Sequence, residues 1–328
     1  MIRAIFRRVR LMIITLFGIS ILSFLIIQLP PGDYLDNYIE QLRQRGDALD
    51  DARIEALEVR YGLQRPVYAQ YLKWIWGVLQ GDFGRSKAHN MRVTELIGDR
   101  LPLSLAISIS SLVLVYLIGL PIGIYSATRQ YSPGDYLFTF IGFLGLAIPN
   151  FLFALILLWL TFAATGNAAI GLFSPEYAME PWSLAKLIDL IKHLWMPALI
   201  VSTAGTAALI RVVRASLLDE LRKLYVTVAR AKGVSEQRLL FRYPVRIALN
   251  PIISTIGWTL PALVSGELLV SLVMGLPTVA PLFVEALLSQ DMFLAGSIVM
   301  VLSSLTVLGT LISDILLVMT DPRIREAV

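Results

Sequence analysis

Few side chains in this sequence are of the types that perform catalysis. The chain has two histidines, His89 and His193, which lie far apart, and it has no cysteine. Neither histidine has a metal-binding spacing such as His-Glu-x-x-His, and a chain without cysteine has no thiolate ligand or nucleophile. The sequence has neither a Gly-x-x-x-x-Gly-Lys-Ser/Thr phosphate loop nor a Gly-x-Ser-x-Gly nucleophile elbow. We therefore predict no catalytic residue, no metal site and no cofactor bound by this chain.

Two acidic residues, Glu267 and Asp314, stand within long apolar stretches. A charged side chain at the centre of a bilayer costs about 3 kcal/mol on insertion scales, so both should face the protein interior or a pore. Glu267, next to Gly266, is a candidate for a translocation path or gate, and hydrogen bonding between helices is its alternative role. For Asp314 the structural role is favoured.

A basic segment, "LYVTVARAKGVSEQRLLFRYPVRIALNP" at 224–251, separates two apolar stretches. Gly233 tolerates left-handed backbone geometry and Ser235 can cap a helix, so we expect a helix, a turn and a second helix. Ala229, Ala231 and Gly233 have small side chains or none, which lets a partner surface approach the backbone, while neighbouring basic residues supply donors. These properties fit docking onto a soluble protein and contact with anionic lipid headgroups equally well.

The composition predicts that most of the chain lies in a membrane. Of the 328 residues, 56% are hydrophobic and 16% are charged, and the net charge of +4 does not suggest nucleic-acid binding. Six apolar segments are long enough to cross a bilayer, at 11–29, 101–127, 137–163, 194–213, 251–274 and 294–319. We therefore predict an all-α integral membrane protein with six transmembrane helices.

The basic residues predict the orientation of these spans. Four arginines and no acidic residue precede the first span, which by the positive-inside rule places both termini in the cytoplasm. The proline-rich end of this span is a poor site for signal-peptide cleavage. We assign 1–30 to the cytoplasmic N-terminus and first span, 31–100 to an external helical insert, and 101–328 to the other five spans. The basic cytoplasmic loop of the last region is 214–250.

The external insert should be helical. Residues 37–63 have the pattern of two short amphipathic helices, and a third helix places Tyr71, Trp74, Ile75 and Val78 on one side. We expect Trp74 and Trp76 to anchor this helix among the lipid headgroups, with a stacking platform for a sugar or peptide as the alternative.

Short motifs along the whole chain resemble those of a known family. They are "YGLQRPVYAQYLKW" and "GDFGRS" in the insert, "DRLP" at 99–102, Pro149-Asn150, Ala-Arg-Ala-Lys-Gly at 229–233, Glu267, Asp291, and "DPRIR" at 321–325. These are similar to permease subunits of the dipeptide/oligopeptide/nickel family of ABC importers. The sequence departs from the wider importer pattern Glu-Ala-Ala-x-x-x-Gly, which here reads Thr227, Val228, Ala229 before Gly233. It also departs at 272–281, where the family has an aromatic residue and Pro-Gly-Leu-Gly.

The resemblance implies a pore-forming subunit that catalyses nothing itself. Members of the family pair with a second homologous permease in a bacterial or archaeal cytoplasmic membrane. Two ATPase subunits, which hold ATP and Mg, dock below, and an extracytoplasmic binding protein delivers substrate. The coupling helix that docks on the ATPase would include Ala229, Arg230, Ala231, Lys232, Gly233, Ser235 and Glu236. Candidate path or gate residues are Pro149, Asn150, Gly266 and Glu267.

Peptides are the expected substrates, and oligosaccharides, nickel chelates and opine-like compounds are the alternatives within the family. The rival from another class is a self-sufficient secondary transporter, in which Glu267 and Asp314 would bind coupling ions. Such transporters usually carry an internal repeat, and the small residues at 229–233 have no role in that hypothesis.

Overall fold

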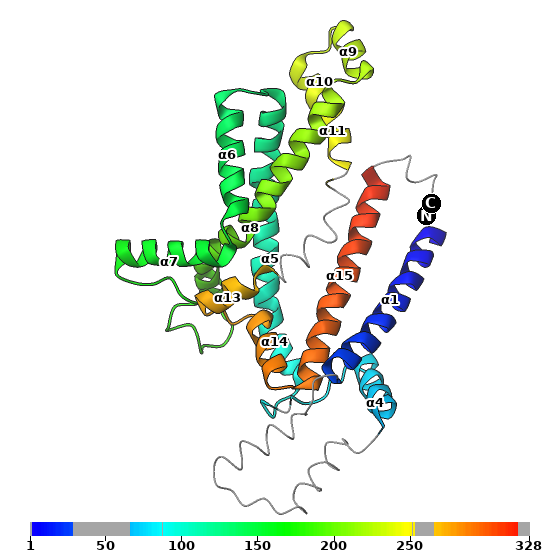
Figure 1. Cartoon of the computed structure of the whole chain (residues 1–328), viewed down its shortest axis with the longest axis vertical. Coiled ribbons are helices and arrows are strands. Elements are labelled where there is room, and N and C mark those ends of the chain that lie inside the picture. The colour runs from blue at the N-terminus through cyan, green and yellow to red at the C-terminus, as the bar shows by residue number, and fades with distance from the viewer. Residues whose placement is uncertain (1, 29–65, 87, 251, 253–265, 321–328) are drawn as a thin grey trace, which may run out of the picture. The chain divides into compact units, whose positions relative to one another are not determined.

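The computed structural model describes residues 2–28, 66–86, 88–250, 252 and 266–320 (Figure 1). In this part of the chain the regular structure is helical, with one isolated bridge between Arg85 and Arg92. The helices are α1 (Ile2–Gln28), α4 (Val67–Leu79), α5 (Val93–Thr128), α6 (Pro133–Ala147), α7 (Asn150–Thr165), α8 (Leu184–Leu221), α9 (Leu224–Ala231), α10 (Glu236–Arg242), α11 (Pro244–Ala248), α13 (Leu268–Met274), α14 (Val279–Leu288) and α15 (Met292–Thr320). Two compact units are described separately below: the larger unit, Leu103–Pro277 with Leu308–Val328, and the smaller unit, Ile2–Pro102 with Thr278–Val307.

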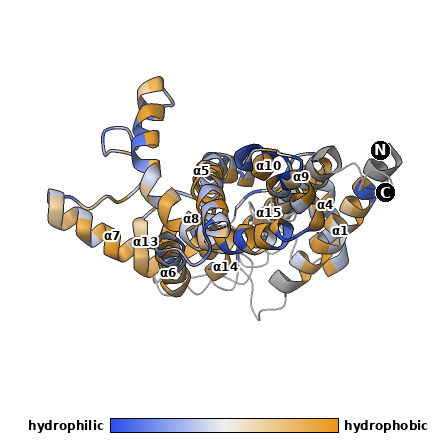
Figure 2. Cartoon of the chain, turned by 90° about the horizontal axis from the view of Figure 1, so that it is seen from above, coloured by the Kyte–Doolittle hydropathy of each residue, from blue (hydrophilic) through white to orange (hydrophobic). Residues whose placement is uncertain are grey.

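Long apolar helices account for most of the described chain. Four of them, α1, α5, α8 and α15, are long and apolar enough to cross a membrane. Figure 2 shows hydrophobic residues on the described helices, seen from above. The bent pairs α6–α7 and α13–α14 bring the number to six if each pair forms one span. The predicted all-helical class is therefore confirmed for the described residues, with four to six candidate spans.

The third apolar segment is not the continuous helix over 137–163 that its composition predicted. It forms α6 and α7, whose axes differ by 102° at a short break (Figure 1). Ile148 is extended (ψ 119°), and Pro149 precedes α7 as its N-cap residue. The break has a local cause, because proline lacks the N–H that a helix interior needs and disfavours helical geometry in the residue before it.

Close helix packing builds the larger unit around α8, which is also longer than the predicted 194–213. A Cβ atom placed on Gly123 of α5 would lie 2.6 Å from Cβ of Val213 on α8. One placed on Gly145 of α6 would lie 2.8 Å from the Thr203 side chain, also on α8. These glycines therefore permit the close approach of helices that small residues provide in membrane proteins.

The smaller unit buries one face of α4 against α1. The Trp74 ring stacks on Phe24 with centroids 5.9 Å apart, and the Tyr71 hydroxyl is 2.8 Å from the Ser20 hydroxyl. The predicted apolar face of α4 is thus confirmed, but the prediction for Trp74 was wrong. Trp74 is 4% exposed, so it is a core residue rather than a headgroup anchor or a platform, whereas Trp76 is 64% exposed. The two helices predicted within 37–63 lie outside the described residues.

Candidate functional site

The basic loop, defined here as 222–250, follows α8 and contains α9, α10 and α11. Figure 1 shows α9 and α10 beyond the end of α8, where they are the outermost helices of that end of the larger unit. The expected helix, turn and helix are present, with α9 ending at Ala231 and α10 beginning at Glu236.

The turn between these helices is closed by backbone hydrogen bonds. The Gly233 N–H donates to the Arg230 carbonyl at 3.0 Å, and the Val234 N–H donates to the Ala229 carbonyl at 3.3 Å. Gly233 has φ +77°, so the turn has the two bonds and the left-handed residue of a Schellman motif. Ser235 stands at the N-cap position of α10, but its side chain makes no capping hydrogen bond, which corrects its expected role.

Arg230 and Glu236 form an ion pair across this turn. Arg230 donates from Nε to one carboxyl oxygen of Glu236 and from Nη2 to the other, at 3.0 Å for the second bond. Both side chains are more than half exposed. The sequence led us to expect that the basic residues of the segment supply donors to a partner, and within the described residues Arg230 gives two of its donors to Glu236.

An apolar base connects the basic loop to the membrane helices. Val245 and Ala248 of α11 are buried with Leu217 of α8 and Ala127 of α5 in one cluster. Leu239 of α10 is 1% exposed. These side chains join the loop to the ends of α5 and α8 by close packing.

The exposed side of the loop is concave and positively charged. A hollow of about 580 Å³ lies beside α9, between Leu224, Val228 and Tyr243. Beneath it the Tyr225 hydroxyl donates to Glu220 at 2.6 Å, and burial together with this bond raises the pKa of Tyr225. Five exposed basic side chains of the loop have no ion pair within the described residues, namely Arg222, Lys232, Arg238, Arg242 and Arg246.

Glu267 lies at the N-terminal end of α13 with its side chain fully buried. Its carboxyl oxygens have no hydrogen bond of ordinary geometry within the described residues, and Ser104 of α5 supplies the polar side chain beside it. α13 packs against α7 and α8, and its last residue, Met274, accepts a hydrogen bond from the Gly171 N–H at 2.9 Å. The carboxyl group is therefore inside the larger unit, as expected for an acidic residue in an apolar segment.

Of the other candidate path residues, two lie at the break between α6 and α7 and one directly precedes Glu267 in the chain. Pro149 and Asn150 form the break between α6 and α7, and within the described residues no hydrogen bond joins either of them to Glu267. Gly266 is exposed, and the side chain of Asp314 lies outside the described part of the chain. The described residues contain no group of three His, Asp or Glu side chains that could hold a metal ion.

Asp291 holds the smaller unit together in a way that residue types alone did not reveal. Its Oδ2 accepts hydrogen bonds from the Ser86 hydroxyl at 2.6 Å and from the Ala88 N–H at 3.1 Å. Its Oδ1 accepts from the Leu294 N–H at 3.2 Å. The motif "GDFGRS" ends at Ser86, so the signal for this contact was present as two separate family motifs 205 residues apart.

Known proteins resemble this chain along its whole length. Residues 119–326 match the family model "binding-protein-dependent transport system inner membrane component", and residues 1–108 match the model of the N-terminal region of such components. The oligopeptide transport system permease protein AppB of Bacillus subtilis is 38% identical over 323 residues, which is 98% of each chain. A putative peptide permease protein of Brucella ovis is 32% identical, with 94% of this chain and 95% of the relative covered.

The inner membrane ABC transporter permease protein YejB of Escherichia coli O157:H7 is 31% identical over 356 residues, with 97% of each chain covered. The family expected from the sequence motifs is thus confirmed. With one family model matching most of the chain and relatives matching from end to end, this multi-pass membrane protein belongs to the family of binding-protein-dependent transport system inner membrane components.

Proposed function

We propose that this chain is the pore-forming permease subunit of an ATP-driven importer of dipeptides and oligopeptides. The observation that carries the proposal is the 38% identity with an oligopeptide permease over 98% of both chains. Similarity of this extent includes the spans, the basic loop and the external region together. It favours peptides over the oligosaccharide, nickel and opine alternatives.

The basic loop is proposed as the coupling element that docks on a partner ATPase. Three features of its geometry support this role: a hydrogen-bonded glycine turn, an apolar base on α5 and α8, and a hollow lined by Lys232 in a loop with other exposed basic side chains. An ATPase surface with an acidic rim and an apolar projection would complement it. Closure of the ATPase pair on ATP would then move α11 and, through the packed base, the ends of the membrane helices.

The complete transporter would contain partners that this chain lacks. We assign to it a second homologous permease, two ATPase subunits with ATP and Mg, and an extracytoplasmic binding protein that delivers the peptide. The chain itself would catalyse no reaction. It would cross the cytoplasmic membrane six times, with α6–α7 and α13–α14 as interrupted spans and both termini in the cytoplasm. The 31–100 region would be an external insert.

Glu267 and the break at Pro149-Asn150 are proposed as parts of the path or its gate. Irregular backbone within a membrane is tolerated where it is buried in protein or lines a water-filled cavity, which is the setting that a path requires. Gly266 would allow movement next to the buried carboxyl group.

Purification followed by reconstitution tests the proposal. The tagged chain, solubilised from its own membrane in a mild detergent, should retain an ABC ATPase and a second permease. Vesicles containing this complex should accumulate labelled tri- to pentapeptides only with ATP on the ATPase side and the binding protein on the opposite side. Oligosaccharides and nickel should not be accumulated under the same conditions. Uptake by the chain alone, driven by an ion gradient, would instead establish a secondary transporter.

A further inference from the structure

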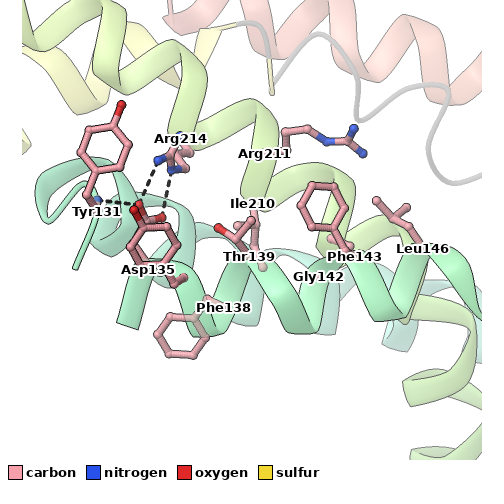
Figure 3. Close-up of a pocket in the computed structure, with 12 residues that line it drawn as sticks. Tyr131, Asp135, Phe138, Thr139, Gly142, Phe143, Leu146, Ile210, Arg211 and Arg214 are labelled. Carbon is pink, nitrogen blue, oxygen red and sulfur yellow. Dashed lines mark hydrogen bonds and ion pairs between the residues drawn. The ribbon is translucent and has the colours of Figure 1, made fainter. Parts of the chain in front are cut away.

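An apolar groove runs between α6 and α8 in the larger unit (Figure 3). Its volume is about 310 Å³, and side chains from these two helices and from the turn before α6 line it. Phe138, Phe143 and Leu146 of α6 form much of the wall, with Ile210 of α8 opposite. Both helices belong to candidate membrane spans, so the medium that bathes the groove is the bilayer or another membrane helix.

One end of the groove is closed by a charge pair that is complete in itself. Arg214 donates from Nε to Oδ1 of Asp135 at 3.0 Å and from Nη2 to Oδ2 at 2.9 Å. The Tyr131 N–H donates to the same carboxylate at 2.9 Å. Asp135 is 2% exposed, and this pairing cancels its charge at the groove. The pair therefore leaves no net negative charge there to repel an anion.

Arg211 supplies an uncompensated positive charge to the same groove. It lines the groove from α8, one turn before Arg214, and Figure 3 shows it beside Phe143 and Leu146, away from the Asp135 end. Its side chain is exposed, and it has no ion pair or hydrogen bond within the described residues. A guanidinium next to apolar walls calls for an anionic partner that also has an apolar part.

We propose that this groove binds a phospholipid with an anionic headgroup, its phosphate on Arg211 and one acyl chain along Phe143 and Leu146, toward the middle of the bilayer. Basic pockets between transmembrane helices are known to bind anionic lipid headgroups on the cytoplasmic side. Arg211 lies near the end of α8 that leads into the basic loop, which is the cytoplasmic end in the proposed orientation. The site is independent of peptide transport and would exist in the isolated chain.

The surroundings of the groove favour lipid over a second permease as the occupant. The outer face of α6 continues the apolar wall with large exposed side chains, Tyr136, Leu137, Phe140, Ile141 and Leu144. A surface of this kind is what acyl chains solvate. A lipid brings a phosphate for Arg211 and acyl chains for the apolar wall in one molecule, so it matches both features of the groove.

Lipid binding by the purified full-length chain tests the proposal. Native mass spectrometry gives the affinities for dioleoylphosphatidylglycerol and for dioleoylphosphatidylcholine, which differ in headgroup charge. Arg211→Gln should weaken phosphatidylglycerol binding about fivefold, the effect of one basic residue at a membrane surface. It should weaken phosphatidylcholine binding less, because the choline cation already offsets the charge of that phosphate. The matched control is Arg222→Gln, which removes an exposed arginine at the end of the same helix outside the groove. It should change neither affinity.

A second variant tests the apolar part of the site. A Cβ atom on Gly142 would lie 3.8 Å from Ala207, an ordinary contact, so Gly142→Leu should fold and fill the groove. This variant should bind both lipids more weakly, and the midpoint of its thermal unfolding should be unchanged. Soluble glycerol phosphate should not compete. The proposal is overturned if Arg211→Gln binds phosphatidylglycerol normally, if filling the groove has no effect, or if glycerol phosphate competes as well as the lipid. If Gly142→Leu keeps its affinity for lipid but no longer retains the second permease on purification, the groove is instead a protein interface.

Discussion

Arg230 and Glu236 are joined by two parallel hydrogen bonds across the left-handed turn at Gly233. The pair is exposed, so solvent screens it and it adds little to stability. Its effect is geometric, because it connects the end of α9 to the start of α10. We infer that it sets the angle at which the proposed docking surface is presented.

Reversing the charges separately and together tests this inference. Arg230→Glu places two carboxylates across the turn and should lower binding-protein-stimulated ATP hydrolysis about fivefold through like-charge repulsion and lost donors. The swap Arg230→Glu with Glu236→Arg restores the pair and should recover most of the activity. Arg238→Glu, which reverses an exposed charge of the same loop that has no ion pair among the described residues, shows how far a charge reversal alone lowers hydrolysis. If the swap is as defective as Arg230→Glu alone, Arg230 itself contacts the ATPase.

The same pair predicts how Glu236 titrates. The hydrogen bonds and charge of Arg230 hold the pKa of the Glu236 carboxyl below its ordinary value. A lowered pKa means that the pair is fully formed above the ordinary glutamate pKa and is lost only as the pH falls through the lowered value. In 13C-glutamate-labelled protein, the Glu236 carboxyl signal, assigned by its absence in Glu236→Gln, should titrate at a lower pH than an ordinary glutamate. Arg230→Gln should move the midpoint upward, and an unmoved midpoint would contradict the pairing in solution.

Ser86 and Asp291 give a prediction about the stability of the smaller unit. Asp291 is fully buried, and Ser86→Ala removes one of the three hydrogen bonds to its carboxylate. The loss should lower the free energy of unfolding by about 2 kcal/mol, as for other bonds to buried charged groups. Ser289→Ala is the matched control, because that hydroxyl bonds to a carbonyl of its own helix at the surface. The free energies of unfolding of the two variants are compared in a denaturing detergent. If they are equal, the Ser86 hydrogen bond contributes nothing to stability.

Much of the fold was predictable because its determinants are local. Uninterrupted apolar length identifies a span, and a glycine between two short helical patterns identifies the turn at Gly233. The face of α4 that contains Tyr71 and Trp74 also follows from helical spacing. The break at Pro149 was not predicted, although the proline was evident, because a proline can kink a membrane helix or end it. Neighbouring helices decide between these outcomes.

Contacts between distant segments could not be predicted from spacing. Trp74 resembles an interfacial anchor until α1 is known to place Phe24 against it. Asp135 and Arg214 are 79 residues apart, and their pair depends on the packing of α6 on α8. Ser132 and Asp135 did form a local signal, since the Ser132 hydroxyl accepts from the Asp135 N–H and caps α6.

Glu267→Gln separates a role in the path from a role in packing. The change keeps the shape of the side chain and removes its charge, so the buried site beside Ser104 should still be filled and the complex should assemble. If the carboxyl group belongs to the path or gate, uptake in reconstituted vesicles or basal ATP hydrolysis should change by at least about threefold. Glu176→Gln, an exposed position outside the proposed path, serves as the control. Normal uptake together with unchanged basal hydrolysis would leave packing as the only role of Glu267.

Gly233 has two distinct properties that substitutions can separate. Its φ of +77° is strained for any residue with a side chain, least for asparagine and most for a β-branched residue. Its Cβ direction is open, with no atom of the described residues within 4 Å of the Cβ position. A Cβ atom there therefore meets none of the described residues, and we expect a steric effect of a substitution to come from a partner.

We expect both Gly233→Val and Gly233→Asn to express and insert normally but to lose most stimulated ATP hydrolysis and peptide uptake, because the proposed ATPase surface approaches the bare backbone. If the loss came instead from backbone strain in the turn, Gly233→Asn would be nearly normal while Gly233→Val failed, because asparagine tolerates left-handed geometry. Gly166 provides the matched control, having φ +74° and likewise no atom within 4 Å of its Cβ position, but lying at the end of α7 outside the basic loop. Gly166→Val should therefore retain coupling. Normal stimulation and uptake in Gly233→Val would remove the basis for docking at this turn.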